Sequence, residues 1–196
     1  ETLKFADPVS ENPVVRLTSP ANESHLPLGS NRAAYRRGNS LIFAGTRDEK
    51  AGLFRLDSKS GEIRQFAEID ALDMRWFGLT PDDRNCLCWS GDKLITVSTG
   101  NGRSRDIYRA GDGWTRVPSL SISEDGLFAA VIEKKDETHR IRLITTVKGS
   151  ATTVVESDTP LADILIRPKR AGIAYRRGAE IWLANFDGKQ NYKLRT

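Results

Sequence analysis

The chain has 196 residues, and 38% of them are hydrophobic, which is enough for a sizeable core. Its 30 basic and 26 acidic residues give a formal charge of +4, but they are interspersed along the chain and form no basic run with interleaved aromatics. Because the basic residues are dispersed, nucleic acid is not expected as a partner, and because no stretch has the length of a transmembrane helix, neither is a membrane.

A four-residue turn recurs along the sequence at a nearly constant step. The turns begin at Arg36, Thr80, Ser123 and Arg167, which are 44, 43 and 44 residues apart, and a short apolar run follows each one. A period in the low forties without any helical pattern is typical of four-stranded blades stacked around an axis. The sequence therefore predicts an all-β propeller of antiparallel blades, with about four blades in this chain.

Each period can be divided into four strands, separated by glycine, asparagine and aspartate turns. In the first blade the expected strands are 31–35, 41–44, 53–57 and 62–66, and in the second they are 76–79, 86–89, 94–98 and 106–109. In the third blade they are 120–123, 127–133, 141–146 and 152–155, and in the fourth they are 164–167, 172–175, 180–185 and 191–194. Polar and apolar residues often alternate in these runs, so the faces of each sheet can pack on neighbouring blades.

Residues 14–18 resemble an outer fourth strand, although they precede the first inner strand. Propellers commonly use such a strand to complete their last blade, which removes an open sheet edge. Because the fourth period already has its own outer strand, we expect residues 1–196 to be one unit, the N-terminal half of a propeller of roughly six to eight blades. The alternative is a complete four-bladed ring in which residues 14–18 are a spare or exchanged strand.

The cysteines and the acidic turns predict structural roles. Cys86 and Cys88 point to one face of a strand, too far apart for a disulfide, and are expected in the core. No other cysteine is present to build a zinc cluster of the CxxC type. The pairs at 82–83 and 124–125 fall in turns, where short acidic side chains satisfy backbone groups.

Candidate binding residues lie where connections and loops open on one face of a propeller. His25 precedes the first blade, Arg47 lies in the loop 46–50, and Lys134, Lys135 and His139 lie in the loop 134–139. Cations gathered on this face could bind carboxylates, and arginine suits a bidentate contact with them. Arg177 could join them. The alternative is that each is an ordinary exposed loop residue.

Catalytic and metal-binding motifs are absent from the sequence. There is no GxSxG, HExxH, P-loop or GxGxxG pattern. Two histidines that are two blades apart cannot complete a metal site by themselves, so no cofactor is expected within the chain.

The blade motifs resemble a known family. Residues 85–94 (NCLCWSGDKL), 106–109 (DIYR), 113–114 (GW) and 120–126 (LSISEDG) look like the middle of oligogalacturonate lyase-type propellers. Residues 15–18 (VRLT) and the first blade, with SGEIR at 60–64, are similar to that family and to the wider TolB-like propellers. The resemblance implies β-elimination on oligogalacturonides, a reaction of polysaccharide lyases in pectin degradation. In it, a cation neutralises the uronate carboxylate and a base removes the adjacent proton.

The resemblance also implies a divalent metal in the full-length parent, held by histidines in later blades that this sequence does not reach. Where the family tends to place a histidine and a glutamine before an asparagine, this chain has Gly29-Ser30-Asn31, so no catalytic residue is assigned. One expected function is a lyase-like propeller that binds or cleaves uronate oligosaccharides together with its remaining blades. The other is a non-catalytic TolB-like propeller that binds a protein or a glycan. A periplasmic or secreted location is favoured over the cytoplasm.

Overall fold

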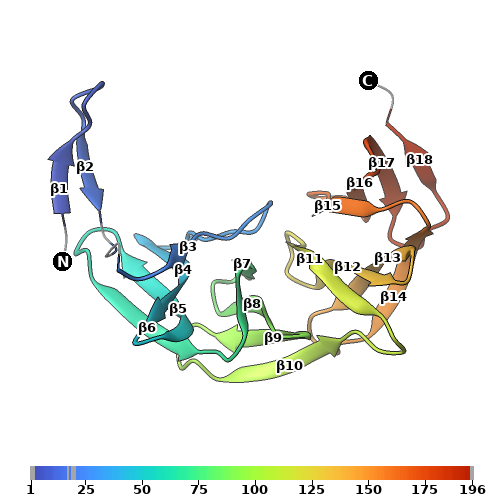
Figure 1. Ribbon diagram of the computed structural model, residues 1–196, viewed down its shortest axis with the longest axis horizontal. Coiled ribbons are helices and arrows are strands. Elements are labelled where there is room, and N and C mark those ends of the chain that lie inside the picture. The colour runs from blue at the N-terminus through green and yellow to red at the C-terminus, as the bar shows by residue number, and fades with distance from the viewer. Residues whose placement is uncertain (1–2, 17, 19–20, 195–196) are drawn as a thin grey trace.

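The computed structural model describes residues 3–16, 18 and 21–194, which form eighteen β-strands and no helix. Four four-stranded antiparallel sheets follow one another along an open arc, with their inner strands toward its concave side (Figure 1). These sheets are blades 1 to 4 of the predicted propeller architecture. No helix in this part of the chain is long and apolar enough to cross a membrane.

The strands of each blade run in chain order from the inside of the arc to the outside. Blades 1 and 2 contain β3 (Ser24–His25), β4 (Ser40–Arg47), β5 (Lys50–Asp57) and β6 (Ile63–Glu68), then β7 (Leu72–Leu79), β8 (Asn85–Ser90), β9 (Lys93–Ser98) and β10 (Ser104–Arg109). Blades 3 and 4 contain β11 (Thr115–Ile122), β12 (Phe128–Lys135), β13 (Thr138–Thr145) and β14 (Ala151–Ser157), then β15 (Leu161–Ile166), β16 (Gly172–Arg177), β17 (Glu180–Asn185) and β18 (Asn191–Lys193).

Alternation along the strands divides the core into layers between blades. In β8, Cys86 and Cys88 face blade 1 and belong to one buried cluster, whereas Leu87 and Trp89 face blade 3 and belong to another. Both cysteines are fully buried and unpaired, as predicted, and burial raises the pKa of the Cys86 thiol to about 12. Such a thiol is a packing residue rather than a nucleophile.

The inner strand of blade 1 differs from the predicted strand 31–35. The strand β3 is shorter and earlier, and only an isolated bridge joins Ala34 to Leu41. Residues 26–33, the axial loop, leave the sheet and run beside β7, where the Leu28 N–H donates to the Arg75 carbonyl (2.8 Å) and the Leu79 N–H donates to the Arg32 carbonyl (2.8 Å). The prediction was wrong at the start of the strand, because these residues satisfy backbone groups on the inner edge of blade 2, whereas Ala33 and Tyr35 keep backbone hydrogen bonds to Ile42 and Ser40 of β4.

The N-terminal strands form a separate hairpin at one end of the arc. β1 (Leu3–Ala6) and β2 (Pro13–Arg16) pair with each other and belong to none of the four blades (Figure 1). The predicted strand 14–18 therefore overlaps β2, although Leu17 is outside the described residues. Figure 1 shows this hairpin and blade 4 at opposite ends of an open arc, so the described residues do not form a closed four-bladed ring.

A glycine contact repeats from blade to blade. Gly102, Gly149 and Gly188 lie in the hairpins between the third and fourth strands of blades 2, 3 and 4, each with a positive φ near 70°. A Cβ at each position would overlap a backbone carbonyl oxygen on the outer strand of the preceding blade. The turn signals seen in the sequence thus also set how closely adjacent blades approach.

Candidate functional site

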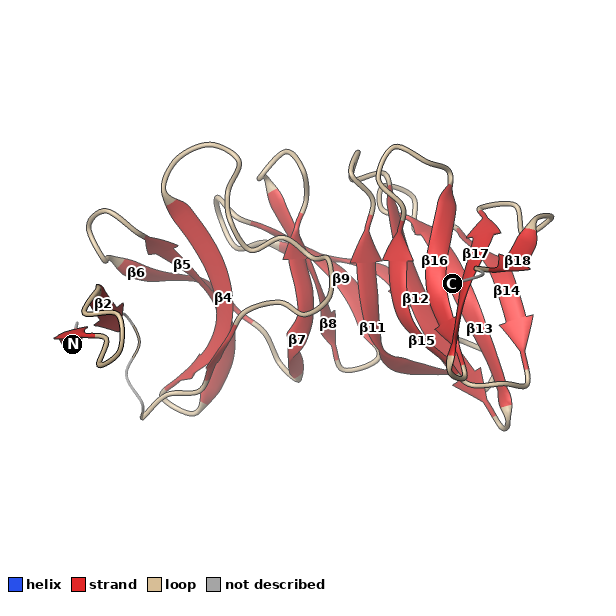
Figure 2. Ribbon diagram, turned by 90° about the horizontal axis from the view of Figure 1, so that it is seen from above, coloured by secondary structure: helices blue, strands red, loops and turns tan. Residues whose placement is uncertain are grey.

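The antiparallel order of the strands gives the arc two distinct faces. Hairpins between second and third strands, and the connections between blades, emerge on one side, here called the connection face. Turns between first and second strands, and hairpins between third and fourth strands, emerge on the other side, here called the turn face. Figure 2 shows the loops gathered along two opposite edges of the strands.

The predicted residues of blade 1 lie on the connection face, where they interact locally. The Nε2 atom of His25 lies 2.5 Å from the Glu23 carboxylate. The guanidinium of Arg47 lies over the Phe54 ring, 5.3 Å from its centroid. The structure does not bring either side chain to the predicted residues of blade 3, because blade 2 lies between them (Figure 1).

The expected loop 134–139 in blade 3 is much shorter than predicted. Strand β12 extends to Lys135 and strand β13 begins at Thr138, so only two residues connect them. His139 is consequently a strand residue, 7% exposed, with no hydrogen-bond partner at Nδ1. Lys134 is its cross-strand neighbour in β12, and Lys135 donates from Nζ to the Asp112 carbonyl (2.9 Å).

A buried polar network ties blades 2 and 3 together near the connection face. The fully buried Glu133 carboxylate accepts hydrogen bonds from the Tyr108 hydroxyl (2.6 Å) and from Nε of Arg140 (2.7 Å). The Arg140 guanidinium also stacks on Trp114, 3.8 Å from a ring centroid. Burial, reinforced by the hydrogen bond to Glu133, raises the pKa of Tyr108. Both oxygens of the Glu133 carboxylate therefore accept hydrogen bonds that hold the blades together.

The turn face carries a hollow close to the axis. Its volume is about 260 Å³, and all four blades or their inner loops line it. Ser30 and Asn31 come from the axial loop, Arg36 from the first turn of blade 1, and Glu124 and Pro168 from the corresponding turns of blades 3 and 4. The Asn31 amide is held by donation from Nδ2 to the Leu120 carbonyl (2.8 Å).

A second hollow adjoins the first, between blades 3 and 4. Its volume is about 570 Å³, and it shares Ser123, Glu124 and Ile166 with the axial hollow. The two hollows therefore form one continuous depression, here called the turn-face groove. Its remaining lining includes two aromatic and three cationic side chains: Phe128, Phe186, Arg167, Lys169 and Arg170.

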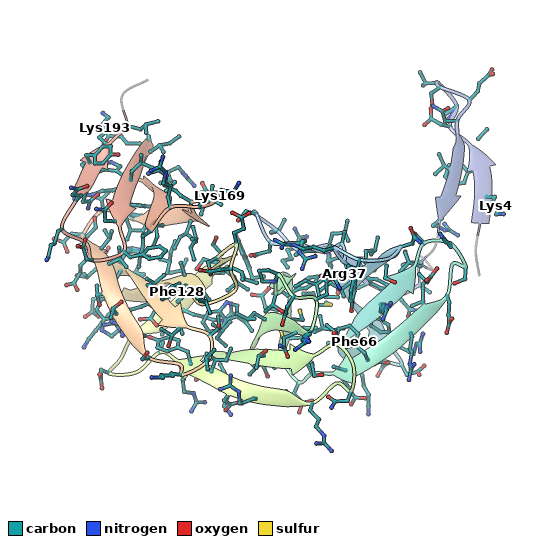
Figure 3. The ribbon with its side chains drawn as sticks, turned by 180° about the vertical axis from the view of Figure 1, so that it is seen from behind. Lys4, Arg37, Phe66, Phe128, Lys169 and Lys193 are labelled. Atoms are coloured by element: carbon teal, nitrogen blue, oxygen red, sulfur yellow. The ribbon has the colours of Figure 1, made fainter. Side chains whose placement is uncertain are left out.

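Four cations of the turn-face groove have no acidic partner. Among the described residues, no ion pair or side-chain hydrogen bond engages Arg36, Arg167, Lys169 or Arg170. Figure 3 labels Lys169 on the first turn of blade 4 and Arg37 on the first turn of blade 1, both along the concave side of the arc. The groove thus has positive charge contributed from both ends, with Glu124 between them.

Asp83 fixes the turn that carries Arg36. Its carboxylate accepts a hydrogen bond from the Arg36 backbone N–H (3.0 Å) and forms an ion pair with Arg32 (2.6 Å). Burial acts to raise the pKa of this carboxyl, but the Arg36 N–H and the Arg32 guanidinium outweigh burial and hold the pKa below its usual value. A carboxylate of blade 2 therefore positions a cation of blade 1.

The sequence carried a signal for the groove cations that its interpretation missed. Asp82 and Asp125 serve the turns of blades 2 and 3 as predicted, since each accepts from a neighbouring hydroxyl and a backbone N–H. In the blade 4 turn Lys169 stands at the position of these acids, whereas the blade 1 turn has Gly38 there. A cation in a repeat position that is acidic in blades 2 and 3 could have indicated a binding surface around Lys169.

The described residues do not fit a metal centre. They contain no group of three or more histidine, cysteine, aspartate or glutamate side chains that could hold an ion. His25 and His139 lie in different blades, and Asp82, Asp83 and Asp125 are occupied by hydrogen bonds within the turns. No step of a reaction is therefore assigned to a metal on this part of the chain.

Comparison with known proteins identifies the fold. Neither a protein-family model nor a curated protein sequence matches the chain. Among solved structures, an oligogalacturonate lyase in complex with manganese has a TM-score of 0.93 at 20% identity, over 100% of this chain and 60% of that one. An oligogalacturonate lyase from Vibrio parahaemolyticus has a TM-score of 0.92 at 17% identity, over 100% of this chain and 59% of that one.

A more distant similarity covers the wider group of propellers. TolB from Acinetobacter baumannii has a TM-score of 0.66 at 14% identity, over 98% of this chain and 48% of that one. The chain thus spans about 60% of the length of the lyases it matches. These likenesses confirm the predicted β-propeller fold. They also confirm the predicted resemblance to oligogalacturonate lyase-type and TolB-like propellers.

Proposed function

We propose that this chain is part of a propeller that binds anionic, uronate-containing oligosaccharides. We further propose that the whole protein cleaves them by β-elimination, as a polysaccharide lyase of the oligogalacturonate type. The observation that carries the proposal is the agreement of the entire chain with the lyase fold at a TM-score of 0.93. The unpaired cations of the turn-face groove add a chemical reason, since they suit a ligand that carries several carboxylates.

The chemistry of the substrate explains why such cations would matter. Oligogalacturonides carry one carboxylate on each sugar ring, and arginine can hold a carboxylate through two parallel hydrogen bonds. In β-elimination a base removes the proton next to the carboxylate, the bond to the leaving sugar oxygen breaks, and a carbon–carbon double bond forms. A cation at the carboxylate favours this proton loss because negative charge develops there. The groove cations would bind and orient the substrate, and the base is not assigned.

The residues predicted from the sequence provide a second hypothesis for the binding surface. In that hypothesis His25, Arg47, Lys134, Lys135 and His139 bind the substrate on the connection face. The local contacts of His25 and Lys135 and the burial of His139 favour the turn face instead. The two faces can be separated by mutation because none of these side chains contributes to the turn-face groove.

The decisive experiment compares the two faces directly. Trigalacturonate would be titrated into the chain and into two double variants, Arg36→Ala with Lys169→Ala on the turn face and Arg47→Ala with Lys134→Ala on the connection face. We expect only the turn-face variant to bind more weakly, and the methyl-esterified trisaccharide to bind poorly to every protein. Loss of binding in the connection-face variant alone would support the second hypothesis, and no binding to any protein would refute the saccharide function.

The catalytic part of the proposal needs the full-length protein. We expect it to release unsaturated uronates, which absorb ultraviolet light. We also expect it to need a divalent cation, bound by residues outside this chain. An inactive full-length protein that still binds trigalacturonate would favour the alternative function. In that alternative the propeller is a non-catalytic, TolB-like binding module for a protein or a glycan, in keeping with Gly29-Ser30-Asn31 in the axial loop. Affinity capture followed by identification of the bound species tests it.

The organisation of the protein is also a proposal. We propose that residues 1–196 form the N-terminal half of a propeller of roughly six to eight blades. Three side chains at the outer edge of blade 4 support it: Ile181 in β17, Tyr192 in β18 and Leu194 directly after β18 are 50%, 51% and 40% exposed. A following blade would cover these side chains. We also propose a periplasmic or secreted location, from the same likeness to oligogalacturonate lyase and TolB structures.

A further inference from the structure

The part of the turn-face groove between blades 3 and 4, here called the blade 3–4 cleft, combines an aromatic surface with cationic walls. Phe128 and Phe186 lie in it with ring centroids 5.3 Å apart and ring planes tilted by 55°. The first turns of the two blades contribute Glu124, Lys169 and Arg170. Figure 3 labels Phe128 in blade 3 and Lys169 on the turn of blade 4.

The cations of the cleft differ from two paired cations elsewhere in blade 4. Arg176 is 2.5 Å from Asp163, and Lys193 is 2.6 Å from Glu180. Arg167, Lys169 and Arg170 have no such partner among the described residues, although all three line a cavity of about 570 Å³. A concave surface with several unpaired like charges favours an anionic ligand.

The acidic residues of the cleft do not neutralise these cations. The Asp125 carboxylate accepts hydrogen bonds from the Ser123 hydroxyl (2.6 Å) and the Leu127 N–H (2.9 Å), which keeps it in its own turn. Glu124 is exposed and unpaired in the described structure, and it lines both hollows of the groove. It is therefore free to accept hydrogen bonds from a ligand.

The blade 4 turn has a non-glycine residue in the left-handed region of backbone conformation. Lys169 has a φ of 56°, and the turns of blades 2 and 3 have a positive φ one position later, at Asp83 (63°) and Gly126 (74°). This conformation disfavours residues with a Cβ, so a lysine at this position costs more than a glycine would.

We propose that the blade 3–4 cleft binds a single uronate ring of an acidic oligosaccharide. The apolar face of the sugar ring would pack on Phe128 and Phe186, its carboxylate would bind Lys169 and Arg170, and a ring hydroxyl would donate to Glu124. Apolar surface with a few convergent polar groups is the usual composition of a small-ligand site. The inference rests on the proposed function, to which it adds the position and the contacts of one sugar.

Chemical-shift mapping with the ¹⁵N-labelled chain tests the location. Digalacturonate is titrated in, with inorganic phosphate and a hexaglutamate peptide as rival ligands. The cleft predicts shifts in the amides of residues 124, 169, 170 and 186, and stronger binding of the saccharide than of either rival. Lys169→Ala with Arg170→Ala is expected to weaken saccharide binding by about tenfold or more, since charged hydrogen bonds are lost.

Two further variants separate binding from folding. Phe186→Leu keeps an apolar side chain but removes the ring, and is expected to weaken digalacturonate binding by a few-fold while changing the spectrum of the free protein only for residues close to position 186. Lys148→Ala with Lys189→Ala removes two lysines that do not line the cleft and is expected to bind normally.

Each outcome decides the inference. If digalacturonate binds but the cleft amides and the cleft variants are unaffected, the inference is overturned and the proposed function stands. If neither digalacturonate nor trigalacturonate binds anywhere on the chain, both are overturned. Equal binding of phosphate or hexaglutamate at the same amides would overturn the assignment to a uronate, because charge alone would then account for the site.

Discussion

Asp83 in the first turn of blade 2 accepts a hydrogen bond of 3.0 Å from the backbone N–H of Arg36 in the first turn of blade 1. The same carboxylate receives the guanidinium of Arg32, and Arg32 in turn donates to the Thr80 carbonyl. A single side chain of blade 2 thus binds both the axial loop and the blade 1 turn, in addition to the backbone hydrogen bonds between the axial loop and β7. Because Arg36 lines the groove, this attachment links the packing of two blades to the position of a groove cation.

Asp83 predicts acid sensitivity of the blade 1 turn. Its pKa is lowered in the folded protein, so its contribution to stability is present above its unfolded pKa of about 4 and is lost as the pH falls through the folded value. We expect Asp83→Asn to lower the free energy of unfolding by about 1–3 kcal/mol at neutral pH. Denaturant unfolding between pH 7 and pH 3 should show the difference from the wild type shrinking with acidification. A difference that is constant with pH would contradict the assigned ionic role.

The Glu133 network predicts a much larger effect for one buried charge than for an exposed one. Glu133→Gln leaves the Arg140 guanidinium, whose side chain is 16% exposed, without its anion, and we expect a loss of about 3–5 kcal/mol in unfolding free energy. The matched control is Glu180→Gln, which breaks an exposed pair with Lys193 and should leave the unfolding free energy nearly unchanged. Similar losses in the two variants would argue against burial as the cause.

Local signals explain how much of the fold the sequence predicted. The predicted strand 94–98 and the observed β9 (Lys93–Ser98) nearly coincide, because Gly91 and Gly100 mark turns that depend on adjacent residues alone. The predicted strand 31–35 was wrong at its start because Arg32 pairs with the backbone of Leu79 in blade 2 rather than with its own blade. No pattern within the first period reveals that contact.

The site was harder to predict than the fold for a related reason. His139 was placed in a loop because six polar residues precede the next apolar run, yet the strands on both sides continue through most of them. Lys169 and Arg170 were recognised as parts of a repeated turn. Their common surface with Phe186 exists only after blades 3 and 4 pack together, so it could not be found from the period.

The repeated glycine contact predicts which hairpin substitutions disrupt blade packing. Gly149 has a φ of 73°, and a Cβ there would overlap the Ile107 carbonyl oxygen on the preceding blade, so Gly149→Ala must shift backbone as well as adopt a strained conformation. We expect it to lower the free energy of unfolding by about 2 kcal/mol or more. Gly111 is the matched control, because its Cβ would meet nothing within 4 Å and its φ is not positive. Gly111→Ala should leave stability unchanged or raise it by about 0.4–1 kcal/mol by restricting the unfolded chain. Thermal and denaturant unfolding of both variants measure the contrast, and equal stability of the two would show that the blades do not depend on this close approach.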